Sequence, residues 1–446
     1  MQTNFTLAQL ADPDIAESER ILRACVHCGF CTATCPTYVL LGDELDSPRG
    51  RIYLIKDMLE NDRPATPEVV RHVDRCLSCL ACMTTCPSGV HYMHLVDHAR
   101  ARIEATYRRP LPDRFLRALL ATVLPSPRLF RLSLLAGRLG RPFARLLAAA
   151  GFVRLAAMLR LVPARLPAAA GATGRRVFPA VGPRRGRVAI LTGCANPVLA
   201  PDINAAAVRV LTRHGIEVVA AGEGCCGALA HHLGREHQAL AQVRRNVDVW
   251  TRELAGEGLD AILITASGCG TTVKDYGFML RTDAAYAGKA ARVAALAQDI
   301  SEFLAARALD LTPPAPLSVA YHAACSLQHG QKITRQPKDL LANAGFQLRE
   351  VPEGHLCCGS AGTYNMLQPE LADRLLARKV ANIERTGAQV IATGNIGCLT
   401  QIAGATRIPI VHTVELIDWA SGGPTPQALQ EIAPDASGAR KFATAT

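Results

Sequence analysis

The sequence has little that would place it in a membrane or outside the cell. Its first twenty residues contain acidic side chains and lack the apolar core of a signal peptide. No run of about 18 uncharged apolar residues occurs, so we expect no membrane-spanning helix. We therefore expect a cytoplasmic protein, in a compartment where disulfides are rare. The 16 cysteines are then expected to be metal ligands or redox groups.

The sequence also lacks the motifs of several enzyme classes. It has no G-x-S-x-G nucleophile motif, no Walker loop and no convincing flavin fingerprint. Two-electron oxidation of an organic substrate normally requires an organic cofactor. Any such oxidation is therefore expected on a partner that binds the cofactor, so no catalytic residue is assigned to this chain.

Acidic residues and lysines are nearly absent from one segment, residues 111–187. It holds fifteen arginines, no lysine and one acid, Asp113, so it carries +14, and the net charge of +11 leaves the rest of the chain at −3. Aromatic residues make up only 5% of the chain, and we expect no nucleic-acid partner. The segment is a candidate surface for an anionic membrane or a partner subunit. The alternative is a packed linker whose arginines face solvent.

Two cysteine patterns with the same spacing occupy the N-terminal part: CVHCGFCTATCP, residues 25–36, and CLSCLACMTTCP, residues 76–87. The spacing C-x2-C-x2-C-x3-C-P is typical of two-cluster ferredoxins, in which the fourth cysteine of each pattern binds the other cluster. We therefore expect two [4Fe–4S] clusters. The predicted ligands of one are Cys25, Cys28, Cys31 and Cys86, and those of the other are Cys76, Cys79, Cys82 and Cys35.

Zinc is the alternative metal, because C-x2-C pairs are common in zinc proteins. Four ligands complete a tetrahedral zinc site, whereas each pattern here has three thiolates plus a fourth that is followed by proline. That arrangement favours iron–sulfur clusters. With the thiolates complete, His27 and His91 are expected to lie at the surface or behind the ligands. About forty residues separate the two patterns, and predicted helices at 47–62 and 93–109 indicate a helical type of ferredoxin domain.

The C-terminal half repeats itself. RVAILTGC (187–194), GCCG (224–227) and AILITASGC (261–269) return as SVAYHAAC (318–325), LCCG (356–359) and VIATGNIGC (390–398). Equivalent cysteines are 131, 132 and 129 residues apart, which indicates a duplicated domain. We expect these cysteines at strand ends and in the loops beyond, at the carboxyl edge of a mostly parallel sheet. The candidates for further clusters or redox-active thiols are Cys194, Cys225, Cys226 and Cys269, then Cys325, Cys357, Cys358 and Cys398.

The segment GEGCCG, residues 222–227, also fits the dinucleotide-binding pattern G-x-G-x-x-G. A dinucleotide site needs an acidic residue at a strand end about twenty positions on. Asp248 is near that position but falls within a helical pattern, and the second copy keeps the cysteines and loses the glycines. We expect the glycines to let the backbone approach a metal site.

The predicted fold class is α plus α/β. Residues 1–108 are expected to form a helical two-cluster ferredoxin domain, and residues 109–186 a basic linker of short amphipathic helices at about 115–124, 129–139 and 143–162. Residues 187–312 and 313–425 are predicted to form two duplicated α/β domains, followed by a tail at 426–446.

Two ferredoxin patterns followed by two C…CCG…C domains resemble the iron–sulfur subunits of glycolate oxidase complexes. The resemblance covers nearly the whole chain, and the basic middle segment is its least specific part. It implies a relay of electrons from a separate FAD-containing subunit, which oxidises glycolate to glyoxylate, toward a quinone or another acceptor. An accessory subunit of the same complex and contact with the inner face of the cytoplasmic membrane through residues 111–187 are further expectations.

Other members of the same superfamily keep alternatives open. The chain could serve an anaerobic glycerol-3-phosphate or a lactate dehydrogenase complex, since specificity would reside in the flavin subunit. It could also belong to a disulfide reductase. Against this, the disulfide-reducing subunits of heterodisulfide reductase carry a terminal C-x2-C, whereas Cys269 and Cys398 stand alone here.

Overall fold

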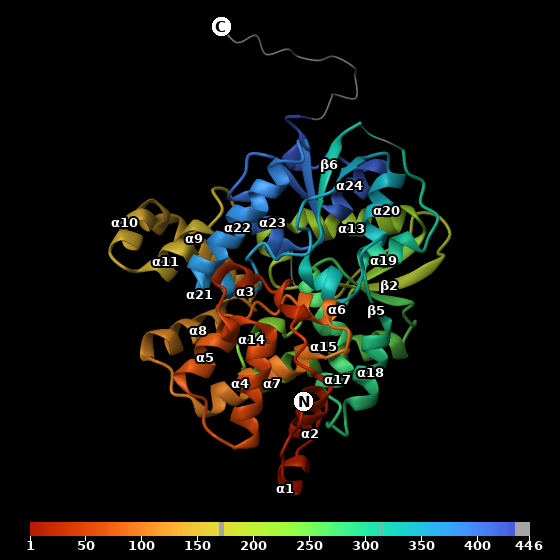
Figure 1. Ribbon diagram of the computed structural model, residues 1–446. Helices are drawn as coiled ribbons and strands as arrows, with labels where there is room; N and C mark the ends of the chain where they lie inside the picture. The colour runs from red at the N-terminus through yellow and green to blue at the C-terminus, as the bar shows by residue number, and fades with distance from the viewer. Residues whose placement is uncertain (169–173, 313, 315, 433–446) are drawn as a thin grey trace.

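The structure is a computed structural model that describes residues 1–168, 174–312, 314 and 316–432. A helical N-terminal part and a group of short helices lie against two α/β units (Figure 1). Residues 169–173 of the basic middle segment and residues 433–446 of the expected tail lie outside the described residues. The domain limits given above stay predictions.

The N-terminal part is helical, as its sequence predicted. Helix α4 begins after Ser47, whose hydroxyl accepts a hydrogen bond from the Gly50 amide at 3.0 Å, with Pro48 in the first turn. The expected helix at 93–109 is α7. The helices of this part are α1 Leu7–Leu10, α2 Pro13–Ala24, α3 Pro36–Leu41, α4 Pro48–Glu60, α5 Pro67–Asp74, α6 Ala81–Thr85 and α7 Tyr92–Thr106.

The described residues of the middle segment form four short α-helices and not three. The helix expected over 143–162 is divided at Gly151, which has φ +86°, a conformation that ends a helix and that side chains other than glycine rarely adopt. The helices are α8 Leu111–Val123, α9 Pro127–Gly140, α10 Ala144–Ala149 and α11 Val153–Arg160. Among all described residues, no helix combines the length and apolar character needed to cross a membrane.

Each α/β unit has a sheet whose strands follow the same order. In the first unit, residues 176–305, the order is β1-β3-β2-β4-β5, with β1 antiparallel and the others parallel; in the second, residues 318–420, it is β7-β6-β8-β9, all parallel. Thus β2, β3, β4 and β5 correspond to β6, β7, β8 and β9, which supports the duplication. The strands are β1 Arg176–Phe178, β2 Gly186–Leu191, β3 Ile216–Ala220, β4 Ala261–Ile264, β5 Ala297–Asp299, β6 Ser318–His322, β7 Gln347–Arg349, β8 Val390–Thr393 and β9 Ile410–His412.

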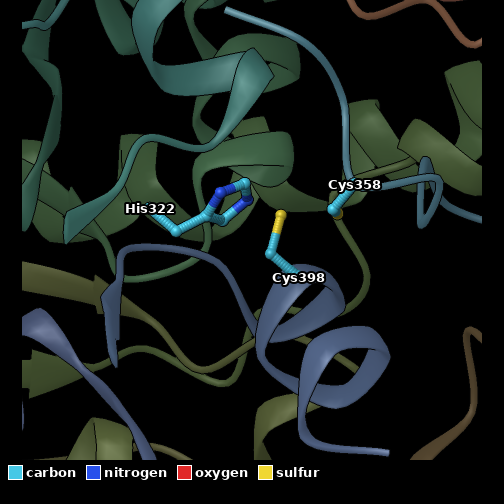
Figure 2. Close-up of side chains that lie close together, drawn as sticks. All are labelled: His322, Cys358 and Cys398. Atoms are coloured by element: carbon cyan, nitrogen blue, oxygen red, sulfur yellow. The ribbon is translucent and has the colours of Figure 1, made fainter. Parts of the chain in front are cut away.

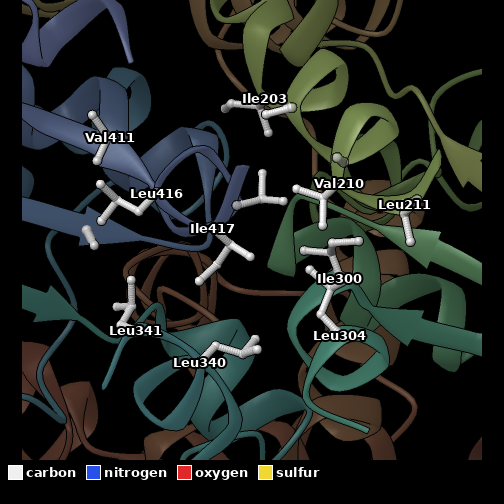
Figure 3. Packing of buried hydrophobic residues seen from close by; sticks show 14 of the residues in the cluster. Ile203, Val210, Leu211, Ile300, Leu304, Leu340, Leu341, Val411, Leu416 and Ile417 are labelled. Carbon is white, nitrogen blue, oxygen red and sulfur yellow. The ribbon is translucent and has the colours of Figure 1, made fainter. Parts of the chain in front are cut away.

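Helices cover the sheets and join the two units. One buried apolar cluster takes residues from both, including Ile203 and Val210 of the first and Leu341 and Ile417 of the second (Figure 3). This continuous core fixes the two sheets against each other. The helices of the first unit are α12 Asn196–Leu199, α13 Pro201–Arg213, α14 Ala228–His232, α15 Glu236–Ala255, α16 Ser267–Lys274, α17 Tyr276–Met279, α18 Ala287–Leu296 and α19 Ile300–Ala305. Those of the second are α20 Gln336–Asn343, α21 Tyr364–Leu367, α22 Pro369–Glu384, α23 Ile396–Ala403 and α24 Thr413–Ala420.

Candidate iron–sulfur sites

The structure brings the first predicted ligand set together around one cavity. We call Cys25, Cys28, Cys31 and Cys86 the outer cysteine set, because it reaches the protein surface at Cys28, which is exposed; Cys25 is buried. All four line the cavity, and Cys82 of the second pattern also reaches it. Burial raises the pKa of Cys31 to about 11, and the neighbouring thiols act in the same direction. Cys86, the fourth cysteine of the second pattern, therefore lies beside the first three cysteines of the first pattern.

The second predicted set lies deeper, and we call it the inner cysteine set: Cys76, Cys79, Cys82 and Cys35. Cys35 lies just before α3, and Cys82 is in the first turn of α6. Burial raises the pKa of Cys82 well above its usual range, and the neighbouring thiols Cys79, Cys76 and Cys35 add to this effect. The crossed arrangement expected from the spacing is thus present in the packing of both sets.

Hydrogen-bond donors and a buried cation surround the inner set. The guanidinium of Arg51, 1% exposed, lies 3.8 Å from Cys35 Sγ, and the Tyr92 hydroxyl lies 3.8 Å from Cys76 Sγ. The amide of Ser78 lies 3.5 Å from the same Cys76 sulfur. Burial opposes the charge of Arg51, but Cys76, Tyr92, Cys35 and Asp46 together outweigh it and keep the pKa of this arginine raised. Such donors stabilise sulfur that carries negative charge.

Arg51 is held in place by a buried network that centres on Asp46. The Arg51 side chain donates to the His72 carbonyl at 2.6 Å and to Asp46 Oδ1 at 3.4 Å. Asp46, which is fully buried, also contacts His72 Nδ1 at 2.9 Å and Arg75 at 2.7 Å. The negative charge of the Asp46 carboxylate is therefore compensated by the two arginines.

The first α/β unit gathers its four cysteines at the carboxyl edge of the sheet. Cys194 follows β2, and Cys225 and Cys226 lie between β3 and α14. Cys269 lies within the first turn of α16 and not in the loop that was expected. Hydrogen bonds from Cys194 and Cys226 lower the pKa of Cys225, whereas the bond with Cys225 raises the pKa of Cys194. These four thiols form one contiguous group, in which Cys194, Cys225 and Cys226 are buried and Cys269 is half-buried.

The second α/β unit repeats this group with Cys325, Cys357, Cys358 and Cys398. Cys398 again lies in the first turn of a helix, α23, where a loop was expected. A buried histidine joins the group: ligand atoms of His322, Cys358 and Cys398 all lie within 4.8 Å of one another. Figure 2 shows the His322 ring and the Cys398 thiol pointing toward each other, with Cys358 beside them. Burial lowers the pKa of His322 to about 3, which keeps its ring neutral and its nitrogen free to bind a metal.

A buried lysine also accompanies the second group. Lys379 on α22 is 2% exposed and donates to the Glu353 carbonyl at 2.9 Å. Burial lowers its pKa, while the charges of all four cysteines of the group oppose that change. Lys379, His322 and Arg51 were not among the residues predicted from the sequence. His322 had a signal, since it ends the strand SVAYH just before Cys325; the two cations had none.

The glycine that follows each cysteine pair has a structural reason different from the one expected. Gly227 and Gly359 have φ of +93° and +87°. A Cβ on Gly359 would lie 2.6 Å from the backbone oxygen of Ala372 on α22. The glycine thus lets the cysteine loop approach a helix backbone closely. Asp248, considered for a nucleotide site, lies on α15 and accepts a hydrogen bond from Tyr286 at 3.0 Å, away from any strand end.

The inner cysteine set packs directly against the second α/β unit. One apolar cluster contains Cys79 of the inner set and the nearby Leu77, together with Cys325, Cys357 and Tyr364 of the second unit. The Thr84 hydroxyl lies 2.7 Å from His329 Nδ1 across the same interface. After burial, the charge of Cys325 is the next influence that raises the pKa of Cys79.

The residues at both N-terminal sets fit [4Fe–4S] clusters. The outer set lines a shared cavity, and its donors are all sulfur, the ligand type that iron–sulfur clusters require. His27 is exposed at the cavity mouth, and His91 is half-buried just before α7, as expected for residues that are not needed as ligands. Arg51 supplies positive charge beside sulfurs that would carry the negative charge of a bound cluster.

Comparison with known proteins agrees with this arrangement. Residues 21–90 match the 4Fe-4S dicluster domain, and residues 188–274 and 319–403 each match the cysteine-rich domain known as CCG. The chain is 46% identical to the glycolate oxidase iron-sulfur subunit of Escherichia coli (strain K12), over 94% of this chain and 99% of that protein. It is 31% identical to the probable glycolate oxidase iron-sulfur subunit of Bacillus subtilis (strain 168), over 90% and 94%.

More distant relatives share the architecture. A subunit of the fumarate reductase (CoM/CoB) of Methanothermobacter marburgensis is 25% identical over 94% of this chain and 76% of that protein. A crystal structure of a hypothetical protein from Helicobacter pylori superimposes with a TM-score of 0.53 and 9% identity, over 94% of this chain and 74% of that one, which shows a shared fold alone.

The fold and the cysteine sites define an iron–sulfur protein that transfers electrons, with two [4Fe–4S] clusters in its dicluster domain. Within this class of protein, the long match at 46% identity to the Escherichia coli subunit defines the family. The chain belongs to the family of glycolate oxidase iron–sulfur subunits.

Proposed function

We propose that this chain is the electron-transfer subunit of a glycolate oxidase complex. An FAD-containing partner subunit oxidises glycolate to glyoxylate, and this chain takes the electrons onward to a quinone or another acceptor. The observation that carries the proposal is the 46% identity over 94% of the chain to such a subunit. The absence of a flavin fingerprint from the sequence agrees with it, because two-electron oxidation of a hydroxy acid needs an organic cofactor.

In this proposal the outer set, Cys25, Cys28, Cys31 and Cys86, holds one [4Fe–4S] cluster and the inner set holds the other. Bound clusters supply carriers that accept and release one electron at a time. The chain's own residues bury Cys35, Cys76 and Cys82 of the inner set, hold Arg51 beside Cys35, and leave Cys28 exposed at the outer set. The exposed edge is then the place where a redox partner approaches.

The packing suggests an order for the sites. The outer and inner sets share one buried cluster, which contains Cys25, Cys76 and Cys82. The inner set shares another with Cys325 and Cys357 of the second α/β unit. We propose that the four thiols of each α/β unit hold further clusters, and that the order runs from the outer set through the inner set to the second unit.

The test is the assembled complex assayed with glycolate, lactate and glycerol-3-phosphate in turn. Glycolate should be oxidised fastest with an artificial acceptor. Replacing Cys79 with Ser should then abolish transfer to quinone while the flavin subunit is still reduced by glycolate. Faster turnover with either of the other two substrates would reassign the complex. Full quinone reduction by the Cys79→Ser complex would contradict the relay.

A surface on the middle helices supports a peripheral position at the inner face of the cytoplasmic membrane. Leu132, Leu139 and Phe143 are 61%, 81% and 58% exposed, and further exposed leucines and phenylalanines lie along α8, α10 and α11. Exposed arginines accompany them: Arg114, Arg128, Arg138, Arg141, Arg145, Arg154 and Arg160. Exposed apolar side chains beside arginines suit insertion into an anionic lipid surface.

Buried contacts hold this surface to the rest of the protein. Arg117 of α8 donates to Asp74 at 2.8 Å and to Asp113 at 3.1 Å, and Arg109 donates to Asp74 at 2.7 Å. Leu120 of α8 and Leu159 of α11 are buried. The helices are thus attached to the rest of the protein, with their outer faces exposed. A free linker would lack these buried contacts.

Flotation with vesicles of anionic and of neutral lipid tests the membrane contact. The complex should float with anionic vesicles only, and the double variant Leu132→Asp, Leu139→Asp should stay in the dense fraction. Leu7→Asp is the matched control, because Leu7 is 88% exposed but lies on α1, outside the basic segment. Absence of flotation in the unmodified complex would remove the membrane part of the proposal and leave the electron relay intact.

A further inference from the structure

The two cysteine-rich units are duplicates, but they differ at two buried positions. The spacing of 131 residues that relates Cys194 to Cys325 pairs His322 with Leu191, the last residue of β2. A Cβ on Gly227 would meet the Ala239 carbonyl and one on Gly359 the Ala372 carbonyl, and this spacing of 133 residues between the two helices pairs Lys379 with Asn246. Leu191 is buried and apolar, and Asn246 is buried and uncharged. A nitrogen base and a cation therefore distinguish the second site from the first.

His322 has the geometry of a ligand. It is 1% exposed and ends β6, so its ring is fixed by the sheet on one side and faces Cys358 and Cys398 on the other. Within the described part of the chain, its Nε2 atom has no hydrogen-bond partner. An unpaired buried imidazole nitrogen costs free energy unless a metal or a proton donor satisfies it.

Lys379 is a second, independent sign of an anionic group at this site. Its amine is buried, the charges of all four thiols favour its charged form, and its hydrogen-bond acceptor is a backbone carbonyl, which carries no charge. A buried cation is stable only beside compensating negative charge. Cysteine thiolates bound to a metal centre would supply that charge.

We infer that His322 is a nitrogen ligand of the metal centre in the second cysteine-rich unit, which makes that centre a mixed cysteine and histidine site. This inference rests on the proposed function, in which the four thiols of the unit hold an iron–sulfur cluster. His322 adds a fifth donor to the four thiols. It lies beside Cys358 and Cys398, and Cys398 lacks the second cysteine of a C-x2-C pair. The first unit, with Leu191, has sulfur donors only. A neutral nitrogen donor leaves such a centre with a higher reduction potential than a thiolate at the same position would.

The test is pulsed EPR on the full chain, purified without oxygen, labelled with ¹⁵N-histidine and reduced. One iron–sulfur signal should show a strongly coupled nitrogen whose frequency changes with the label. His322→Leu, which installs the residue of the first unit, should abolish that coupling. His329→Gln is the matched control, because His329 is buried in the same unit with its nitrogens already 2.7 Å from the Thr84 hydroxyl and 3.1 Å from the His355 carbonyl. The control should keep the coupling.

A second variant, His322→Cys, restores a donor and guards against simple loss of the site. It should retain the iron content, lose the nitrogen coupling and shift the midpoint potential of that centre to a more negative value. Labelled unmodified protein without a strongly coupled nitrogen would overturn the inference, as would coupling that persists in His322→Leu.

Iron at only about eight atoms per chain, the content of two [4Fe–4S] clusters, would also overturn it, since the second unit would then hold no cluster. That result would leave the relay through the outer and inner sets standing. The proposed function fails by a separate result, which is the absence of iron–sulfur reduction by glycolate in the assembled complex.

Discussion

Arg51 is the buried cation beside the inner cysteine set. It joins Cys35, Asp46 and the His72 carbonyl within a space that solvent does not reach. The sequence showed an arginine within a predicted helix, where an arginine is usually solvated. Only the tertiary packing reveals that this one is buried, because its partners come from positions 5 to 21 residues away.

Replacement of Arg51 by Met should lower the free energy of unfolding by about 3 kcal/mol, because it removes one of the two arginines that compensate the buried carboxylate of Asp46 and leaves only Arg75. Urea unfolding without oxygen measures this. Arg49→Met is the control: Arg49 pairs with Glu44 near the surface, and its loss should cost less than about 1 kcal/mol. Equal effects of the two substitutions would show that the buried network does not stabilise the site.

At the scale of elements, the turn that carries each cysteine pair depends on one glycine. Gly359 combines a positive φ with close contact to α22, whereas Gly422 has φ +89° and no atom near its missing Cβ. Gly359→Ala should therefore cost several kcal/mol and displace Cys357 and Cys358, while Gly422→Ala should cost only the backbone strain of about 1–3 kcal/mol. Melting temperatures and iron content measure both. Similar melting temperatures for the two variants would contradict the packing argument.

The interface between the two sheets contains a pH-sensitive contact. His412 Nε2 donates to the Thr265 carbonyl at 2.8 Å, and its Nδ1 accepts from the Val414 amide and caps α24. Burial lowers the pKa of His412 from 6.5 to about 4. As the pH falls, His412 is therefore protonated in the unfolded chain at a higher pH than in the folded protein. The contribution of this group is present above pH 6.5 and is lost progressively as the pH falls toward 4.

The prediction is that stability falls by about 1.4 kcal/mol per pH unit on account of His412 in this window. His412→Asn keeps a capping side chain and removes the titration, so the difference in unfolding free energy between it and the unmodified protein should shrink as the pH drops from about 7.5 to about 5.5. Urea unfolding at several pH values measures the difference. A difference that does not change with pH would contradict the pKa assignment.

The sequence predicted the elements better than the contacts between them. Caps such as Ser47 and Pro48, apolar strands and the repeated cysteines are local signals, and the structure has the corresponding helices and strands. Gly151 divided a helix because its φ is positive, which the alanine-rich pattern around it concealed. Cys269 and Cys398 lie on helices because in both units the helix begins within a few residues of the end of the strand. His322 and Lys379 became visible only when the fold placed them beside the cysteines.

At the scale of the whole molecule, four cysteine groups lie within one continuous structure, and at least three adjoin one another. The outer set is partly exposed, the inner set is buried except for the half-buried Cys79, and the second α/β unit packs on the inner set. The two units share a core, so the second cannot move independently of the first. A rigid arrangement keeps the spacing between redox sites constant.

The most direct test of the electron relay is EPR of the assembled complex, prepared without oxygen and mixed with glycolate. If the relay operates as proposed, glycolate alone generates the signals of reduced iron–sulfur clusters on this chain. Signals that appear with dithionite but not with glycolate, while the flavin subunit is reduced, would contradict it.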